Sequence, residues 1–144
     1  MTIPLWVLLA FALWTLLVLG ATIGTYRWGR ILTGRARFED YGQYRIEGSA
    51  WYKRAMRAHA NCLENLPIYG AIVVVALAIG ASGTALNVLA LVLIVARVAQ
   101  TFVHVAFEQT NVVVSFRSAF YNTQWVCMVA MGILVAIQAA QTLH

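Results

Sequence analysis

The sequence predicts an all-α integral membrane protein whose single domain is a bundle of four transmembrane helices. Hydrophobic residues make up 62% of the 144 residues and charged residues only 10%, whereas soluble domains are about half apolar and a quarter charged. The apolar residues form runs long enough to cross about 30 Å of hydrocarbon. Eight of the ten lysines and arginines lie within residues 27–57. Such clustering is typical of a cytoplasmic membrane face and disfavours a nucleic-acid partner.

Four helices are expected, at about residues 3–30, 48–79, 84–107 and 115–141, in one domain covering residues 1–144. The run from Ile3 to Ile23 is uncharged and lacks a basic start. It is therefore expected to be a retained helix and not a signal peptide. Residues 27–47 are the most polar segment and form the first connection, whereas residues 80–83 form an uncharged tight turn.

The charge distribution predicts how the chain crosses the membrane. The first connection carries the excess of basic residues, and the turn at residues 80–83 carries no charge. Basic connections remain in the cytoplasm. We therefore expect a multi-pass protein with both termini on the opposite side. The connection before Ser115 is then also cytoplasmic.

A polar face opens the second expected helix. Arg57, Asn61 and Glu64 follow an i, i+4, i+7 pattern and so share one face. After Glu64 the chain is uncharged until Arg97. Charged groups within a membrane helix cost a few kcal/mol and are usually paired or functional. For Arg57 and Asn61, headgroup binding is the alternative interpretation to a site.

A second polar face follows on the third expected helix, where Arg97, Gln100 and His104 are spaced i, i+3, i+7. When the chain folds back at residues 80–83, equal rise along both helices brings Glu64 level with about residue 99. The two polar faces should therefore meet at one depth. A buried ion pair between Glu64 and Arg97 is expected to fix the helix register.

Arg117 is the strongest catalytic candidate. A cation in the first turn of the last expected helix opposes the helix dipole. Arg117 and the helix N-terminus could together form an anion site. Ser118 and Tyr121 are weaker candidates on the same helix, and Arg27 could line the site from the end of the first helix. His104 could act as a base or be a residue of the cytoplasmic end.

Other polar or reactive residues favour structural interpretations. His59 lies off the polar face and is expected to form a hydrogen bond between helices. Cys62 and Cys127 have apolar helical surroundings and no CxxC spacing. They predict neither a metal site nor a disulfide framework, and we expect buried, inert thiols.

Three motifs carry a resemblance to a known family: Arg57-Ala58-His59-x-Asn61-x-x-Glu64-Asn65-x-Pro67, Arg97-Val98-Ala99-x-Thr101 and Arg117-Ser118-x-x-Tyr121. Together with four spans, they resemble the MAPEG family, the membrane-associated proteins of eicosanoid and glutathione metabolism. The resemblance covers all four helices but is specific only at these three places.

The resemblance implies a homotrimer that holds glutathione, as co-substrate, between neighbouring subunits near the cytoplasmic face. By position, Arg57, Asn61 and Glu64 would hold the tripeptide, with Arg97 pairing Glu64. Gln100, on the face of Arg97, belongs to the same binding set. Tyr121 would flank the tripeptide, Arg117 would face its sulfur, and Arg27 would reach a carboxylate. Arg117, His104 and Ser118 are the catalytic candidates.

Three residues differ from the eicosanoid members of the family. This chain has Ala60 where prostaglandin E synthase-like members have a second arginine, His104 where a helix tyrosine is found, and Asn65 in place of the tyrosine of leukotriene synthase-like members. These differences argue against prostaglandin or leukotriene chemistry.

We therefore expect glutathione-dependent conjugation of a lipophilic electrophile, or reduction of a hydroperoxide. One alternative is a non-catalytic trimeric protein that binds lipid or has a structural role. Another is a small transporter in which Glu64 relays protons. A relay would favour a carboxylate without a permanent cation beside it, so Arg97 disfavours this second alternative.

Overall fold

The computed structural model describes residues 2–41 and 48–142. Within these residues, four helical segments are long and apolar enough to cross a membrane: Ile3–Leu32, Ala50–Ala78, Thr84–Ala106 and Asn111–Gln141. The first consists of α1 (Ile3–Val18), the π-helix η1 (Leu19–Gly24) and α2 (Thr25–Leu32). The others are α3 (Ala50–Ala78), α4 (Thr84–Ala106) and α5 (Asn111–Thr142). The expected membrane protein built from four long apolar helices is confirmed.

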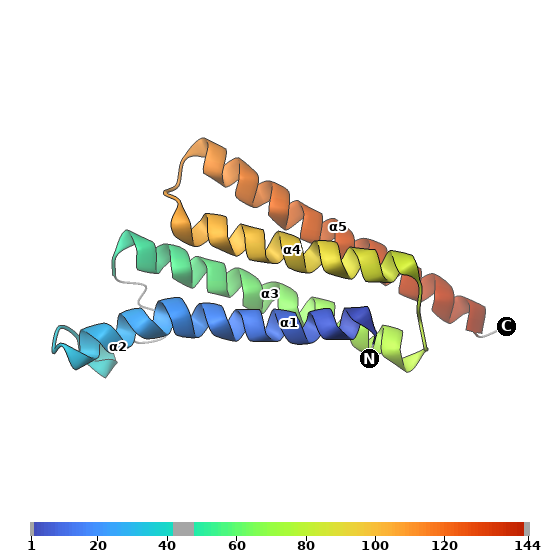
Figure 1. Cartoon of the computed structure of the whole chain (residues 1–144), viewed down its shortest axis with the longest axis horizontal. Helices are drawn as coiled ribbons and strands as arrows, with labels where there is room; N and C mark the ends of the chain where they lie inside the picture. Colours follow the sequence, from blue (N-terminus) through green and yellow to red (C-terminus); the bar gives the residue numbers. More distant parts are fainter. Residues whose placement is uncertain (1, 42–47, 143–144) are drawn as a thin grey trace.

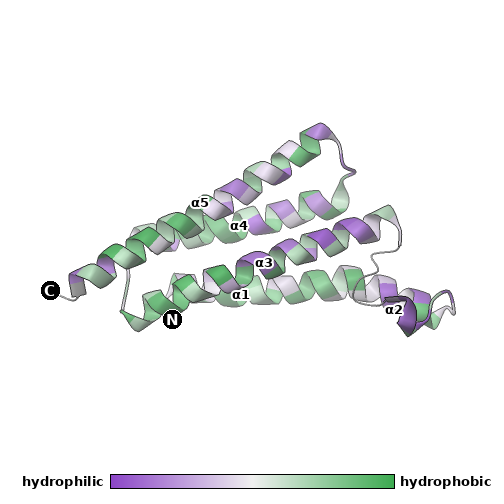
Figure 2. Cartoon of the chain, turned by 180° about the vertical axis from the view of Figure 1, so that it is seen from behind, coloured by the Kyte–Doolittle hydropathy of each residue, from purple (hydrophilic) through white to green (hydrophobic). Residues whose placement is uncertain are grey.

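The helices lie side by side, with alternating direction along the chain (Figure 1). The two termini and the α3–α4 turn lie at one end, which we call the apolar end. The opposite end, here the basic end, contains α2, the start of α3 and the α4–α5 connection. Hydrophilic residues gather toward the basic end, as Figure 2 shows. The polar groups are therefore concentrated at the end of the bundle that contains the α2–α3 and α4–α5 connections.

The main core joins α1, α3, α4 and α5 through buried residues that include Phe11, Tyr69, Leu93 and Met131. The Tyr69 hydroxyl donates to the Pro4 carbonyl at 2.9 Å, so its buried polar group is satisfied. A smaller cluster at the basic end contains Ile23, Tyr52 and Ala55.

At the apolar end, the α3–α4 turn is tied to α5. Gly80 and Gly83 have φ angles of 69° and 141°, which glycine adopts without the steric cost of a side chain. The Ser82 backbone N–H donates to Gln138 Oε1 at 3.1 Å, and Gln138 Nε2 donates to the Ser82 carbonyl at 3.1 Å. This pair of hydrogen bonds fixes the turn against the last helix.

α5 begins at Asn111, one turn before the expected start near Ser115. Thr110 caps it, because the Thr110 hydroxyl oxygen accepts from the Val113 backbone N–H at 3.3 Å. Ser115 is already helical and donates its hydroxyl to the Asn111 carbonyl at 2.9 Å. The connection from α4 to α5 is consequently short.

The π-helix η1 changes the spacing of buried residues in the first segment. Val7, Phe11, Thr15 and Val18 follow the spacing of three or four residues that an α-helix requires. The next buried residue, Ile23, comes five residues after Val18. The wider turn of η1 accommodates this spacing, so the buried face continues from α1 into α2.

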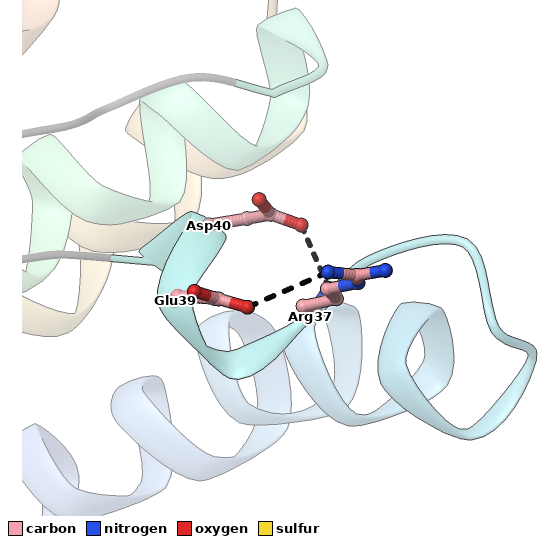
Figure 3. A network of polar contacts seen from close by, with 3 residues as sticks. All are labelled: Arg37, Glu39 and Asp40. Carbon is pink, nitrogen blue, oxygen red and sulfur yellow. Dashed lines mark hydrogen bonds and ion pairs between the residues drawn. The ribbon is translucent and has the colours of Figure 1, made fainter.

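The connection after α2 includes the short 3-10 helix η2 (Phe38–Tyr41). Arg37 Nη1 lies 3.7 Å from Glu39 Oε1, and the Arg37 backbone N–H donates to Asp40 Oδ2 at 2.7 Å (Figure 3). Both side chains of the ion pair are largely exposed, so it contributes little to stability. The rest of this connection, residues 42–47, lies outside the described residues.

Candidate functional site

Three helices line an open polar hollow of about 360 Å³, which we call the α3–α5 hollow. Its lining comprises Asn61 and Glu64 of α3, Gln100 of α4, and Val114, Arg117, Ser118, Tyr121 and Asn122 of α5. Six of these were predicted from the sequence as site residues: Asn61, Glu64, Gln100, Arg117, Ser118 and Tyr121. The expected meeting of polar faces at one depth therefore occurs, and α5 contributes five of the eight lining residues.

Gln100 is the centre of the hydrogen bonds behind the hollow. Its Oε1 accepts from Arg97 Nη1 and from Gln124 Nε2, both at 3.0 Å. Its Nε2 donates to the Arg117 carbonyl at 3.2 Å. Only 3% of Gln100 is exposed. One amide therefore fixes the position of α4 against α5 at the depth of Arg117.

The predicted ion pair between Glu64 and Arg97 does not form within this chain, where the ion pair among described residues is Arg37–Glu39. Glu64 lies on the exposed face of α3, whereas Arg97 is 1% exposed and points into the bundle. The Arg97 guanidinium carbon lies 5.2 Å from the centroid of the Phe11 ring, a favourable cation–π position. That prediction is wrong for the single chain because the two side chains leave their helices in different directions.

Within the described residues, only one of the three side-chain nitrogens of Arg97 has a hydrogen-bond partner. Nη1 donates to Gln100, but Nε and Nη2 have no hydrogen-bond partner within the described residues. Buried donors without partners are uncommon and costly. Two nitrogens of Arg97 are therefore without an acceptor next to Gln100, which itself lines the hollow.

Arg117 lines the hollow and lies within hydrogen-bond distance of Gln109, a residue of the α4–α5 connection. With the Gln109 amide oriented so that its oxygen faces the arginines, that oxygen accepts from Arg57 Nη1 at 3.0 Å and Arg117 Nη1 at 3.1 Å. Because α5 starts at Asn111, Arg117 lies in its second turn. The dipole effect falls off within the first turn. The expected contribution of the helix N-terminus is therefore smaller than the sequence predicted.

His104 lies one turn from Gln100 on α4, but it does not line the α3–α5 hollow. It is 1% exposed, and neither ring nitrogen has a hydrogen-bond partner within the described residues.

His59 is half-buried, and its Nδ1 likewise has no partner in the described part of the chain. The hydrogen bond between helices that was expected for His59 is therefore absent from that nitrogen.

Arg27 belongs to an aromatic cluster at the basic end and does not line the hollow of this chain. Its Nε donates to the Tyr52 hydroxyl at 2.8 Å, and its guanidinium carbon lies 5.2 Å from the Tyr41 ring centroid. Tyr52 is fully buried. Within the single chain, Arg27 joins α2 to α3.

Both cysteines are free and buried. Cys62 Sγ lies 3.9 Å from Thr101 Oγ1, which also accepts from Trp14 Nε1 at 3.3 Å. Cys127 belongs to the main core. These surroundings agree with the expected role of both thiols in packing.

Two residues of the site, Gln109 and Gln124, were not predicted as site residues from the sequence. Gln124 is 1% exposed and donates to Gln100. It continues the spacing of Arg117 and Tyr121 at i+7, so helical periodicity could have identified it. Gln109 lies outside any helix, and no periodic signal marks it.

Comparisons with known proteins agree with this arrangement. A family model described as the MAPEG family matches residues 3–137. No curated protein and no solved structure matches the chain. The match covers α1 to α4, most of α5, and the three polar motifs that form and surround the hollow. This multi-pass integral membrane protein therefore belongs to the MAPEG family.

Proposed function

We propose that this protein binds glutathione and uses its thiolate to conjugate a lipophilic electrophile or to reduce a lipophilic hydroperoxide. The observation that carries the proposal is the α3–α5 hollow, which has a volume of about 360 Å³. It is lined by Arg117, Ser118 and Tyr121 of α5 and by Asn61 and Glu64 of α3. Its volume lies at the lower end of the range for small-molecule sites. The hollow combines a cation for a sulfur anion with polar groups that can hold a peptide.

Arg117 would stabilise the thiolate. A cysteine-type thiol has a pKa of about 8.5 and is only a few per cent ionised at neutral pH. Lowering that pKa by about two units requires roughly 2.7 kcal/mol of preferential thiolate stabilisation. A guanidinium in a partly dry site can supply this, because its charge is less screened there than in water. Asn61 and Glu64, which line the hollow, and Arg57 one turn before Asn61 on α3 would bind the remainder of the peptide.

Both reactions start from the same nucleophile. In conjugation, the thiolate sulfur forms a bond to an electrophilic carbon, and a displaced group leaves with its bonding electron pair. In reduction, the thiolate attacks the terminal hydroperoxide oxygen and the O–O bond breaks. The alkoxide takes a proton to become an alcohol. A second glutathione then converts the sulfenic acid to glutathione disulfide and water.

The position of Glu64 supports a homotrimer. A carboxylate on the exposed face of a membrane helix costs a few kcal/mol unless another group covers it. Another subunit packed on this face of α3 would cover Glu64 and enclose the hollow. Arg27 of that neighbouring subunit could then contribute to the site. Native mass spectrometry that found only monomers would contradict this arrangement.

The second candidate function is a non-catalytic trimer that binds lipid or has a structural role. The contacts of Gln109 favour it, because one amide oxygen already satisfies a donor of Arg57 and a donor of Arg117. Arginines held in this way could simply fix the ends of α3 and α5.

Glutathione binding and thiolate ultraviolet absorbance of the solubilised protein distinguish these functions. Arg117→Ala should retain binding, because Asn61 and Glu64 remain, but should lose the thiolate absorbance and most of the turnover. His104→Ala is the matched comparison, since His104 could instead deprotonate the thiol as a general base. If His104→Ala abolishes the absorbance and Arg117→Ala retains it, the catalytic role belongs to α4. If the parent protein neither binds glutathione nor shows a thiolate, the enzyme proposal fails.

A further inference from the structure

A second hollow, of about 420 Å³, opens at the basic end of the bundle, and we call it the basic hollow. Its lining comprises Ala50, Lys53, Arg54 and Arg57 of α3, with Glu108 and Gln109 of the α4–α5 connection. It shares no lining residue with the α3–α5 hollow. The two hollows are neighbours, because the Gln109 amide oxygen links Arg57 of the basic hollow to Arg117 of the α3–α5 hollow.

The charges that line the basic hollow are not balanced within the described residues. Lys53, Arg54 and Arg57 face a single carboxylate, that of Glu108. The ion pair found in the described part of the chain lies elsewhere, between Arg37 and Glu39. Like charges spaced i, i+4, as in Lys53 and Arg57, destabilise a helix. An anion in the hollow would relieve this repulsion.

Arg54 provides a second, independent observation. Its Nε is buried and has no hydrogen-bond partner within the described residues. A buried guanidinium donor without a partner carries a desolvation cost that a bound anion would remove. The charged hydrogen bond that would result is among the stronger kinds in proteins.

The start of α3 adds a favourable field. Ala50, the first residue of this 29-residue helix, lines the hollow. Ser49 Oγ satisfies the Tyr52 backbone N–H at 3.2 Å, and the N-terminal turn retains its partial positive charge. Helix N-termini with adjacent cations are favourable sites for phosphate groups.

We propose that the basic hollow binds a phosphate group. The three cations approach it from two turns of α3, and the oxygens of a phosphate can accept from several directions at once. The group could belong to an anionic phospholipid headgroup or to a free phosphate compound. The basic hollow lies at the membrane-helix end where such headgroups are found. The proposal does not depend on glutathione.

The test uses the full-length protein in neutral detergent with inorganic phosphate, and in phosphatidylcholine vesicles with or without phosphatidylglycerol. Lys53→Gln with Arg54→Gln removes two cations, which should weaken binding roughly thirtyfold. Arg35→Gln with Arg37→Gln removes the same charge outside both hollows and should leave the affinity nearly unchanged. Stabilisation by phosphate identifies a free phosphate group. Stabilisation by phosphatidylglycerol alone identifies a lipid headgroup.

Equal affinity of the parent and the Lys53/Arg54 variant in both arms would overturn the proposal. Loss of phosphate binding in Arg117→Ala would also overturn it, because the anion would then occupy the α3–α5 hollow. Glu108→Gln removes the single carboxylate of the lining and should strengthen binding several-fold. This variant retains both cations, so it keeps the proposal testable if the double variant fails to fold. Unchanged affinity in Glu108→Gln would contradict the proposal.

Discussion

Arg97 and Gln100 show how a charged residue is held inside the bundle without an acidic partner. The guanidinium donates to Gln100 Oε1 at 3.0 Å and lies over the Phe11 ring at 5.2 Å. A hydrogen bond involving a charged group contributes about 1.5–3 kcal/mol. The sequence placed Arg97 and Gln100 on one helical face correctly, but it assigned the partner of Arg97 to Glu64. Helical spacing predicts the shared face of two residues and not the rotamers that decide their contacts.

Gln100→Leu should therefore destabilise the chain more than Glu64→Ala does. Without Gln100, Arg97 loses its neutral acceptor while it remains buried, at a cost of about 2–3 kcal/mol. Glu64 is exposed and holds no ion pair in the chain. Thermal melting of both detergent-solubilised variants measures the difference. An equally large loss in Glu64→Ala would indicate that Glu64 pairs with an arginine in the assembled membrane protein.

At the scale of elements, the helices could be predicted more closely than the segments between them. Apolar runs and polar spacing located α3 and α4 to within two residues at each end. The start of α5 was predicted one turn late, because Thr110 provides the cap and Ser115 resembles one. Gln109 could not be found, since a residue of a connection follows no helical period.

The α4–α5 connection should influence ligand binding through Gln109. Its amide oxygen accepts from Arg57 and Arg117, so an anionic ligand must displace it to use the same donors. Gln109→Ala should bind glutathione about tenfold more tightly, which corresponds to one weak hydrogen bond to a charged group. Gln109→Glu should bind it more weakly, because a carboxylate would form ion pairs with both arginines.

Calorimetric titration of the solubilised protein measures these affinities. Gln141→Ala changes an exposed glutamine of α5 near the apolar end and serves as the control. Equal affinities for Gln109→Ala and Gln109→Glu would indicate that a ligand never competes with this side chain.

At the scale of the whole molecule, composition predicted the membrane class and the number of long helices. Apolar content and charge asymmetry arise from the bilayer itself, so a single sequence carries them clearly. The pairing of Gln100 with Gln124 and the inward direction of Arg97 depend on how the helices are rotated in the bundle. Spacing along one helix does not contain that information.

The basic end is predicted to face the cytoplasm. Arg35→Cys and Ser82→Cys place one reactive thiol at each end of the bundle, and both native cysteines are buried. In sealed membrane vesicles whose cytoplasmic side faces inward, a membrane-impermeant reagent added outside should label position 82 and not position 35, because basic connections remain cytoplasmic. The reverse pattern would move the α3–α5 hollow to the outer face.

The π-helix η1 has a consequence for how this chain tolerates changes in length. Ile23 follows Val18 by five residues, one more than an α-helical face allows, so η1 behaves as a one-residue insertion that the helix has absorbed. Deletion of Gly20, which has open space beside it, should let the segment become regular α-helix while the Arg27–Tyr52 contact is kept.

Deletion of the exposed Leu13 is the matched control. Leu13 lies in the regular α-helix α1. Its deletion would rotate the side chains of all later residues of the segment by about 100° relative to those before it. Melting of the two deletion variants should therefore differ sharply, with Gly20 the tolerated loss. If both variants melt alike, η1 does not correct the phase of the first membrane helix.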